Sequence, residues 1–225
     1  MHINDIKEYI DPRVFEILSN DGVGLLRPAQ EKAVMEGLFL GNNIIVCTPT
    51  ASGKTLIAEL GMLWSILNRG GKAVYIVPLK ALASEKYHSF IRRYSSIVRI
   101  ALTISDADEV DSRLADYDII ICTSEKLDAL MRHKVGWLSD VRMLVVDEIH
   151  LLNDMSRGPT LEVLITLIRM TINPQIIGLS ATIGNPQDIS GWLNARLVED
   201  DWRPVELRKG IYYDGKKYYY DLKSL

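Results

Sequence analysis

The residue types of a phosphate-binding loop occur in one short run, Thr50-Ala51-Ser52-Gly53-Lys54-Thr55. This run follows the apolar stretch 43–47 and leads into a helix-like stretch that begins at Lys54. In the order strand, loop, helix, backbone N–H groups can surround a phosphate chain, and the helix N-terminus adds partial positive charge. Lys54 would reach the outer phosphates of a nucleoside triphosphate, and the Thr55 hydroxyl would bind Mg²⁺. We therefore expect residues 50–55 to bind a nucleoside triphosphate with Mg²⁺.

Two adjacent carboxylates, Asp147 and Glu148, follow the apolar run 143–146. At a strand end beside the phosphate loop, Asp147 is suited to hold Mg²⁺ through water. Glu148 is suited to polarise an attacking water molecule. A nucleotide kinase needs no such base, because water must be excluded from its reaction. The pair therefore favours an ATPase over a phosphotransferase.

Small hydroxyl residues end a third apolar run, as Ser180-Ala181-Thr182 after residues 175–179. Serine and threonine commonly end strands or cap helices, so this motif is weak when taken alone. Here it follows the other two motifs in order, and each motif comes after a separate apolar run. We interpret the hydroxyls of Ser180 and Thr182 as groups that connect the acidic pair to another surface by hydrogen bonds.

Short apolar runs alternate along the chain with longer amphipathic stretches. This alternation predicts an α/β fold with a mostly parallel sheet and helices on both faces. Ligands of such sheets collect at the carboxyl ends of the strands, where every motif above falls. The expected strands are 43–47, 73–77, 99–103, 118–122, 142–146 and 175–179. The expected helices are 54–67, 80–94, 124–132, 160–170 and 186–193.

The two ends of the chain differ from the alternating centre. Residues 1–41 are expected to be helical, with a break at 20–24. Residues 205–211 are expected to form a strand that leads into a hairpin, with Asp214-Gly215 as its turn. We therefore assign residues 1–205 to one domain and 206–225 to a short C-terminal extension.

Composition indicates a globular protein of 225 residues, with 48% hydrophobic residues and a formal net charge of −3. No apolar run reaches the ~20 residues that cross a bilayer, so we expect no membrane partner. Cys47 and Cys122 each close an apolar run, which is typical of reduced core cysteines and fits the cytoplasm. We expect a monomer.

Gly53-Lys54-Thr55, Asp147-Glu148-Ile149-His150 and Ser180-Ala181-Thr182 resemble motifs I, II and III of superfamily 2 helicases of the DExH type. The resemblance implies a RecA-like P-loop NTPase domain that uses ATP. Upstream, Leu26-Arg27-Pro28-Ala29-Gln30 resembles the family's Q-motif, which implies that Gln30 reads the adenine edge. It also implies that His150 couples hydrolysis to movement through motif III. Ala51 departs from the glycine that often occupies its position.

Two further stretches resemble family motifs that line the track of a single nucleic-acid strand. Pro78-Leu79-Lys80-Ala81-Leu82 resembles motif Ia, and Thr123-Ser124-Glu125-Lys126 resembles motif Ib. Hydroxyls, helix N-terminal amides and lysines can hold phosphates without reading bases. The expected contacts are Pro78, Lys80, Thr123, Ser124 and Lys126.

Three stretches are similar to one branch, the archaeal Hjm-type DNA-repair helicases, which are related to the helicase part of DNA polymerase theta. They are Thr123–Asp128, Arg157–Glu162 and Trp202–Val205. This branch implies an ATP-dependent 3′-to-5′ DNA helicase that acts on single-stranded or forked DNA in repair. An RNA helicase remains an alternative, as does a nucleotide-dependent clamp that holds nucleic acid without unwinding it.

Nothing after Thr182 resembles the second RecA-like domain that such helicases need. That domain carries arginines that complete the ATP site, and such arginines accelerate phosphoryl transfer by ~10³–10⁵ in related systems. The resemblance therefore implies that this chain is the first motor domain alone. We expect it to bind ATP–Mg²⁺ weakly and to hydrolyse it negligibly.

Overall fold

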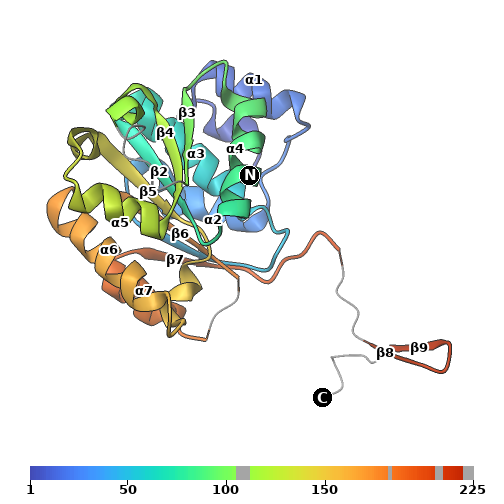
Figure 1. The fold of residues 1–225 in the computed structure, drawn as a ribbon. Helices are drawn as coiled ribbons and strands as arrows, with labels where there is room; N and C mark the ends of the chain where they lie inside the picture. Colours follow the sequence, from blue (N-terminus) through green and yellow to red (C-terminus); the bar gives the residue numbers. More distant parts are fainter. Residues whose placement is uncertain (105–111, 182–183, 206–209, 220–225) are drawn as a thin grey trace.

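The structure, a computed structural model, describes residues 1–104, 112–181, 184–205 and 210–219. Within these residues seven parallel strands form one sheet, in the order β3-β4-β2-β5-β6-β1-β7 (Figure 1). The parallel α/β sheet expected from the sequence is confirmed. The strands are β1 Ile44–Cys47, β2 Lys72–Val77, β3 Ile100–Thr103, β4 Ile119–Thr123, β5 Val141–Val146, β6 Gln175–Ser180 and β7 Arg196–Glu199.

Helices cover both faces of the sheet. α1–α4 pack on one face and α5–α7 on the other (Figure 1). Along β1, Ile44 and Val46 belong to the core between the sheet and α1–α4. Ile45 and Cys47 belong to the core between the sheet and α5–α7. Because successive strand residues point to opposite faces, two covered faces require the continuous apolar runs seen in the sequence. The helices are α1 Pro12–Asn20, α2 Pro28–Met35, α3 Lys54–Arg69, α4 Lys80–Tyr94, α5 Ser124–Arg132, α6 Gly158–Thr171 and α7 Pro186–Leu193.

Short 3₁₀ helices fill several connections between these elements. They are η1 Ile3–Ile6, η2 Leu38–Leu40, η4 Ser112–Asp116, η5 Gly136–Asp140 and η6 Ile149–Asn153. Across the described part of the chain, no helix combines the length and the apolar composition that a bilayer crossing requires.

β7 is a strand that the sequence reading missed. It pairs with β1 in parallel, from Ile44 opposite Arg196 to Cys47 opposite Glu199. Only Val198 of its four residues is buried, because β7 lies at the edge of the sheet. An edge strand with polar residues at both ends lacks the apolar run that marked the other strands.

The N-terminal segment is helical as expected, with a break between α1 and α2. The C-terminal hairpin is also confirmed, as β8 Gly210–Tyr213 and β9 Lys216–Tyr219. Asp214 and Gly215 form its two-residue turn with φ of 46° and 73°, as a type I′ turn requires. Gly210 and Ile211 of the expected strand 205–211 lie in β8, and residues 206–209 lie outside the described residues.

A buried polar contact joins α3 to α4. The Glu59 carboxylate, on α3, is buried and accepts hydrogen bonds from the Arg93 guanidinium and, at 2.6 Å, from the Tyr94 hydroxyl. Burial raises the pKa of Glu59, and the positive charge of Arg93 opposes that shift. Arg93 Nε also donates to Asp21 at the end of α1, at 2.9 Å. A buried carboxylate needs such partners, so these contacts fix α4 against α3.

We expect the thiols of Cys47 and Cys122 to react slowly with iodoacetamide in the folded protein. Burial raises the pKa of Cys47 to about 11 and that of Cys122 to about 12, so the reactive thiolate is scarce in mildly alkaline buffer. Mass spectrometry after timed incubation should find both thiols unmodified, and both alkylated once urea unfolds the chain. Rapid alkylation of the folded protein would contradict this expectation.

Candidate functional site

The three motifs with catalytic residue types meet at one edge of the sheet. β5, β6 and β1 are neighbours, and the motifs lie at or just after their carboxyl ends. Cys47 at the end of β1 is in register with Ser180 at the end of β6, and the next residue, Thr48, donates its N–H to the Ser180 carbonyl at 3.2 Å. Sequence order separates these motifs, but strand order brings them together.

The loop between β1 and α3 has the backbone conformation of an anion-binding turn. Ala51 and Gly53 have φ of 65° and 95°, in the left-handed region, and α3 begins at the next residue. The buried hydroxyl oxygens of Thr48 and Ser52 are hydrogen bonded to each other at 2.7 Å, and this bond connects the start of the loop to its middle. Left-handed backbone followed by a helix N-terminus directs N–H groups toward one point. Ala51 thus adopts a conformation that glycine reaches more easily.

Lys54 lies inside this loop. Its ammonium group donates to the Thr48 carbonyl at 3.2 Å. Burial lowers the pKa of Lys54, while the nearby carboxylates of Glu148 and Asp147 oppose that shift. A phosphate chain in the loop would give the ammonium a stronger acceptor than the carbonyl. Thr50, which the sequence also assigned to the loop, is exposed at its outer side.

Asp147 is the most connected side chain of the site. Its Oδ2 accepts a hydrogen bond from the Tyr75 hydroxyl at 2.8 Å and lies 3.6 Å from the Lys86 ammonium. Its Oδ1 accepts from the Glu148 N–H at 3.1 Å. Burial raises the pKa of Tyr75, and the Asp147 charge raises it further, so the hydroxyl stays a donor. These contacts hold the carboxylate at the end of β5.

Thr55 and Asp147 fit the requirements of a Mg²⁺ site. The Thr55 hydroxyl accepts from Lys86 Nζ at 2.9 Å, and the same ammonium lies beside Asp147. A single cation is therefore already held between the two oxygens that the sequence assigned to the metal. Among the described residues no group of three or more His, Cys, Asp or Glu side chains could hold a metal. Mg²⁺ suits this arrangement, because it commonly binds one or two protein oxygens together with phosphates and water.

Glu148, His150 and Ser180 form a contact chain between the second and third motifs. His150 Nδ1 lies 3.3 Å from Glu148 Oε2 and 3.2 Å from the Ser180 hydroxyl. Glu148 has φ of 53°, an uncommon backbone conformation that is concentrated at functional sites. Coupling of hydrolysis to movement through His150 would use these contacts, and it stays a prediction. Thr182 lies outside the described residues.

Gln30 lies against the phosphate loop. Its Oε1 accepts from the Arg27 N–H at 2.8 Å, and its Nε2 donates to the Gly53 carbonyl at 3.1 Å. Arg27 also donates to the Ala51 carbonyl at 2.8 Å and stacks over the Trp202 ring. Gln30 is buried, and its hydrogen bonds join α2 to the phosphate loop. Its role in reading adenine stays a prediction.

The expected nucleic-acid contacts occupy the other half of the same edge. Val77 and Thr123, the last residues of β2 and β4, are in register, so motifs Ia and Ib lie side by side. Lys80 is exposed at the start of α4. Thr123 caps α5 by accepting from the Lys126 N–H at 3.4 Å. Pro78 and Ser124 are partly exposed beside them.

Lys126 differs from the other expected nucleic-acid contacts. Its residue is only 5% exposed, packed on the inner side of α5. A residue with so little exposed surface offers little contact area to a strand outside. Its role as a phosphate contact therefore stays a prediction that this conformation does not favour.

Two residues of the site were missed by the sequence reading, Tyr75 and Lys86. Tyr75 lies in a buried strand run, where a tyrosine is indistinguishable from a core aromatic. Lys86 follows Ala83 by three residues and precedes Phe90 by four, and both of those are buried. A lysine on the buried stripe of an amphipathic helix was the available signal.

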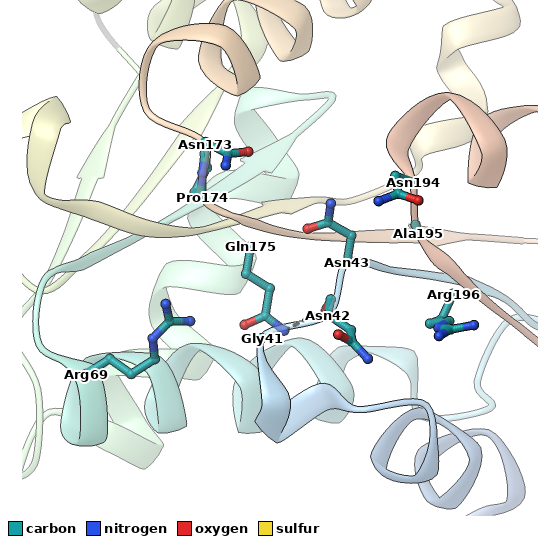
Figure 2. Close-up of a pocket in the computed structure, with 10 residues that line it drawn as sticks. All are labelled: Gly41, Asn42, Asn43, Arg69, Asn173, Pro174, Gln175, Asn194, Ala195 and Arg196. Atoms are coloured by element: carbon teal, nitrogen blue, oxygen red, sulfur yellow. Dashed lines mark hydrogen bonds between the residues drawn. The ribbon is translucent and has the colours of Figure 1, made fainter.

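A polar cavity of about 530 Å³ lies at the opposite edge of the sheet, where β1, β6 and β7 begin (Figure 2). The Asn43 side chain, in its wall, donates to the Leu193 carbonyl at 3.0 Å and accepts from the Ile176 N–H at 2.7 Å. Gln175 donates to the Asn42 carbonyl at 2.9 Å. These amides join the starts of neighbouring strands, and no predicted site residue lines the cavity.

Comparison with known proteins identifies relatives that match most of the chain. Residues 27–189 match the model of the family described as DEAD/DEAH box helicase. ATP-dependent DNA helicase Hel308 of Pyrococcus horikoshii is 49% identical over 215 residues, which cover 96% of this chain and 30% of that protein. The protein of the same name from Methanocaldococcus jannaschii is 54% identical over 207 residues, or 89% and 17%. The resemblance to the archaeal branch is thus confirmed, and the chain spans less than a third of either relative.

Solved structures agree with the expected RecA-like fold. The DUF1998 helicase MrfA bound to DNA superposes with a TM-score of 0.73 at 28% identity, over 86% of this chain and 30% of that chain. Its complex with DNA and AMPPNP gives a TM-score of 0.74, again at 28% identity, 86% and 30%.

We expect Tyr75→Phe to lower the free energy of unfolding by about 1–2 kcal/mol, because Asp147 loses a buried hydrogen bond to its charged form. Urea denaturation followed by circular dichroism measures the change. Tyr9→Phe is the matched control, since Tyr9 is 40% exposed and the same atom is removed. Equal stability of the two variants would show that the Tyr75–Asp147 contact contributes nothing.

Proposed function

The chain belongs to the DEAD/DEAH box helicase family, and on that premise we propose that it is the ATP-binding motor domain of an ATP-dependent DNA helicase. The observation that carries the proposal is the meeting of Thr55, Asp147 and Glu148 at one edge of the sheet, next to the loop that holds Lys54. This set supplies each group that nucleotide hydrolysis requires from one domain.

Each residue has a role that follows from its position. Lys54 and the backbone N–H groups of residues 50–55 would bind the phosphates, and Gln30 would read the adenine edge. When bound by Thr55 and Asp147, Mg²⁺ would neutralise charge on the outer phosphate oxygens. Glu148, 34% exposed, would orient and polarise the attacking water. Through its contact with Ser180, His150 would couple ATP hydrolysis to movement of the rest of the motor.

The proposed nucleic acid is single-stranded or forked DNA. Pro78, Lys80, Thr123 and Ser124 would contact its backbone, because their groups can bind phosphate without reading sequence. The names of the relatives, which are DNA helicases, support DNA over RNA. By family resemblance the movement would be 3′-to-5′ and the task DNA repair at forks, in the cytoplasm and as a monomer.

A second RecA-like domain would complete the ATP site. The relatives are more than three times longer than their matching segments, which leaves ample length for such a domain. We assign residues 1–205 to the first motor domain and the hairpin region 206–225 to the connection that follows. ATP would close the two domains on a strand, and hydrolysis would reopen them.

Glu148→Gln in the full-length protein is expected to lower ATP hydrolysis by about 10²–10⁴-fold, because the general base is lost. ATP binding, measured by titration with a fluorescent analogue, should be retained, and DNA unwinding should be lost. Glu16→Gln, a change on the exposed side of α1, is the matched control. ATP-dependent binding of DNA without unwinding in the unaltered protein, unchanged in Glu148→Gln, would favour the clamp. Stimulation of ATP hydrolysis by RNA strands alone would favour the RNA helicase.

The chain of 225 residues by itself is expected to hydrolyse ATP at least about 10³-fold more slowly than the full-length protein, because the transferring phosphate lacks its arginines. Steady-state phosphate release with and without single-stranded DNA measures both rates. Robust DNA-stimulated turnover by the chain alone would overturn the requirement for a second domain.

A further inference from the structure

Lys86 occupies the place where the two proposed metal ligands converge. Its Nζ donates to Thr55 Oγ1 at 2.9 Å and lies 3.6 Å from Asp147 Oδ2, and its side chain is 20% exposed. It also lies over the face of the Tyr75 ring, 5.8 Å from the centroid. None of the six family motifs includes Lys86, which belongs to the middle of α4.

We propose that Lys86 is an internal counter-ion of the metal site, which holds Thr55 and Asp147 together without metal and must leave when Mg²⁺ binds with nucleotide. This inference rests on the proposed function, because it takes Thr55 and Asp147 as the Mg²⁺ ligands. Lys86 acts on the metal through those ligands, so it is a positioning residue.

The two cations compete because they need the same oxygens. Bound at the Thr55 hydroxyl, Mg²⁺ and the water between it and Asp147 would fill the space that the Lys86 ammonium occupies. Like charges at such short range also repel. Binding of Mg²⁺ therefore includes the loss of the Lys86–Thr55 hydrogen bond and of the contact with Asp147.

The side chain can leave without moving its helix. α4 is fixed to α3 further along by the buried contact between Glu59 and the Arg93–Tyr94 pair. Lysine has a flexible four-carbon stem, and the partial exposure of Lys86 gives its ammonium a path to solvent. Displacement of Lys86 is thus a local event at the carboxyl end of the sheet.

Removal of Lys86 should make nucleotide binding depend more steeply on Mg²⁺. In the full-length protein, the dissociation constant of a fluorescent ATP analogue is measured in EDTA and at saturating Mg²⁺. Lys86→Met should raise the ratio of the first constant to the second by about tenfold, the scale of one charge-assisted hydrogen bond. The rise should come from a lower constant with Mg²⁺. An unchanged or lower ratio overturns the proposal, and so does a ratio that rises only because the constant in EDTA rises, which would instead assign Lys86 to the phosphates.

Three further variants make the result specific. Lys86→Arg keeps the charge and should keep the ratio of the unchanged protein. Arg92→Met removes one positive charge from the exposed side of the same helix and should also leave the ratio unchanged. Lys86→Gln replaces Lys86→Met if circular dichroism shows that the latter does not fold.

The unchanged protein separates failure of this inference from failure of the proposed function. If it binds the analogue no better with Mg²⁺ than in EDTA, the proposed metal ligands are wrong and both ideas fall. If it does bind better with Mg²⁺ and Lys86→Met does not raise the ratio, only the role of Lys86 is overturned.

Discussion

Parallel strands can pair only when the chain returns across the sheet between them, so the turns that follow the strands all lie at one edge. In this protein the order β5-β6-β1 groups the three motifs with catalytic residue types, and the pair β4-β2 groups the two proposed nucleic-acid motifs. The boundary between the groups falls between β2 and β5. Everything proposed for the site depends on this arrangement, because each motif alone is an ordinary turn.

Asp147 lies on that boundary and has contacts from both sides. Tyr75 comes from β2, and Lys86 comes from α4, which begins at the exposed Lys80. α4 therefore carries Lys80, the proposed DNA contact. Together, β2 and α4 supply two partners of Asp147, the proposed metal ligand. Such a continuous element is a physical route by which the two halves of the edge can affect each other, through contacts that Mg²⁺ would change.

The sequence predicted the fold class and six of the sheet strands, because these depend on local runs and short spacings. The parts that it missed depend on tertiary neighbours. Tyr75 acquires its role from the pairing of β2 with β5, and Lys86 acquires its role from the packing of α4 beside β2. Lys126 was predicted from a motif, whereas its burial depends on how α5 packs against its neighbours.

β7 carries no proposed site residue, yet the sheet is incomplete without it. It covers the open side of β1, the strand that holds the phosphate loop. A chain cut at the limits of the family match, residues 27–189, would lose β7 together with Val14 and Leu18 of the core. β1 would then be an exposed edge with unpaired backbone groups, a known cause of aggregation. The segment that matches the family is therefore shorter than the segment that completes the sheet.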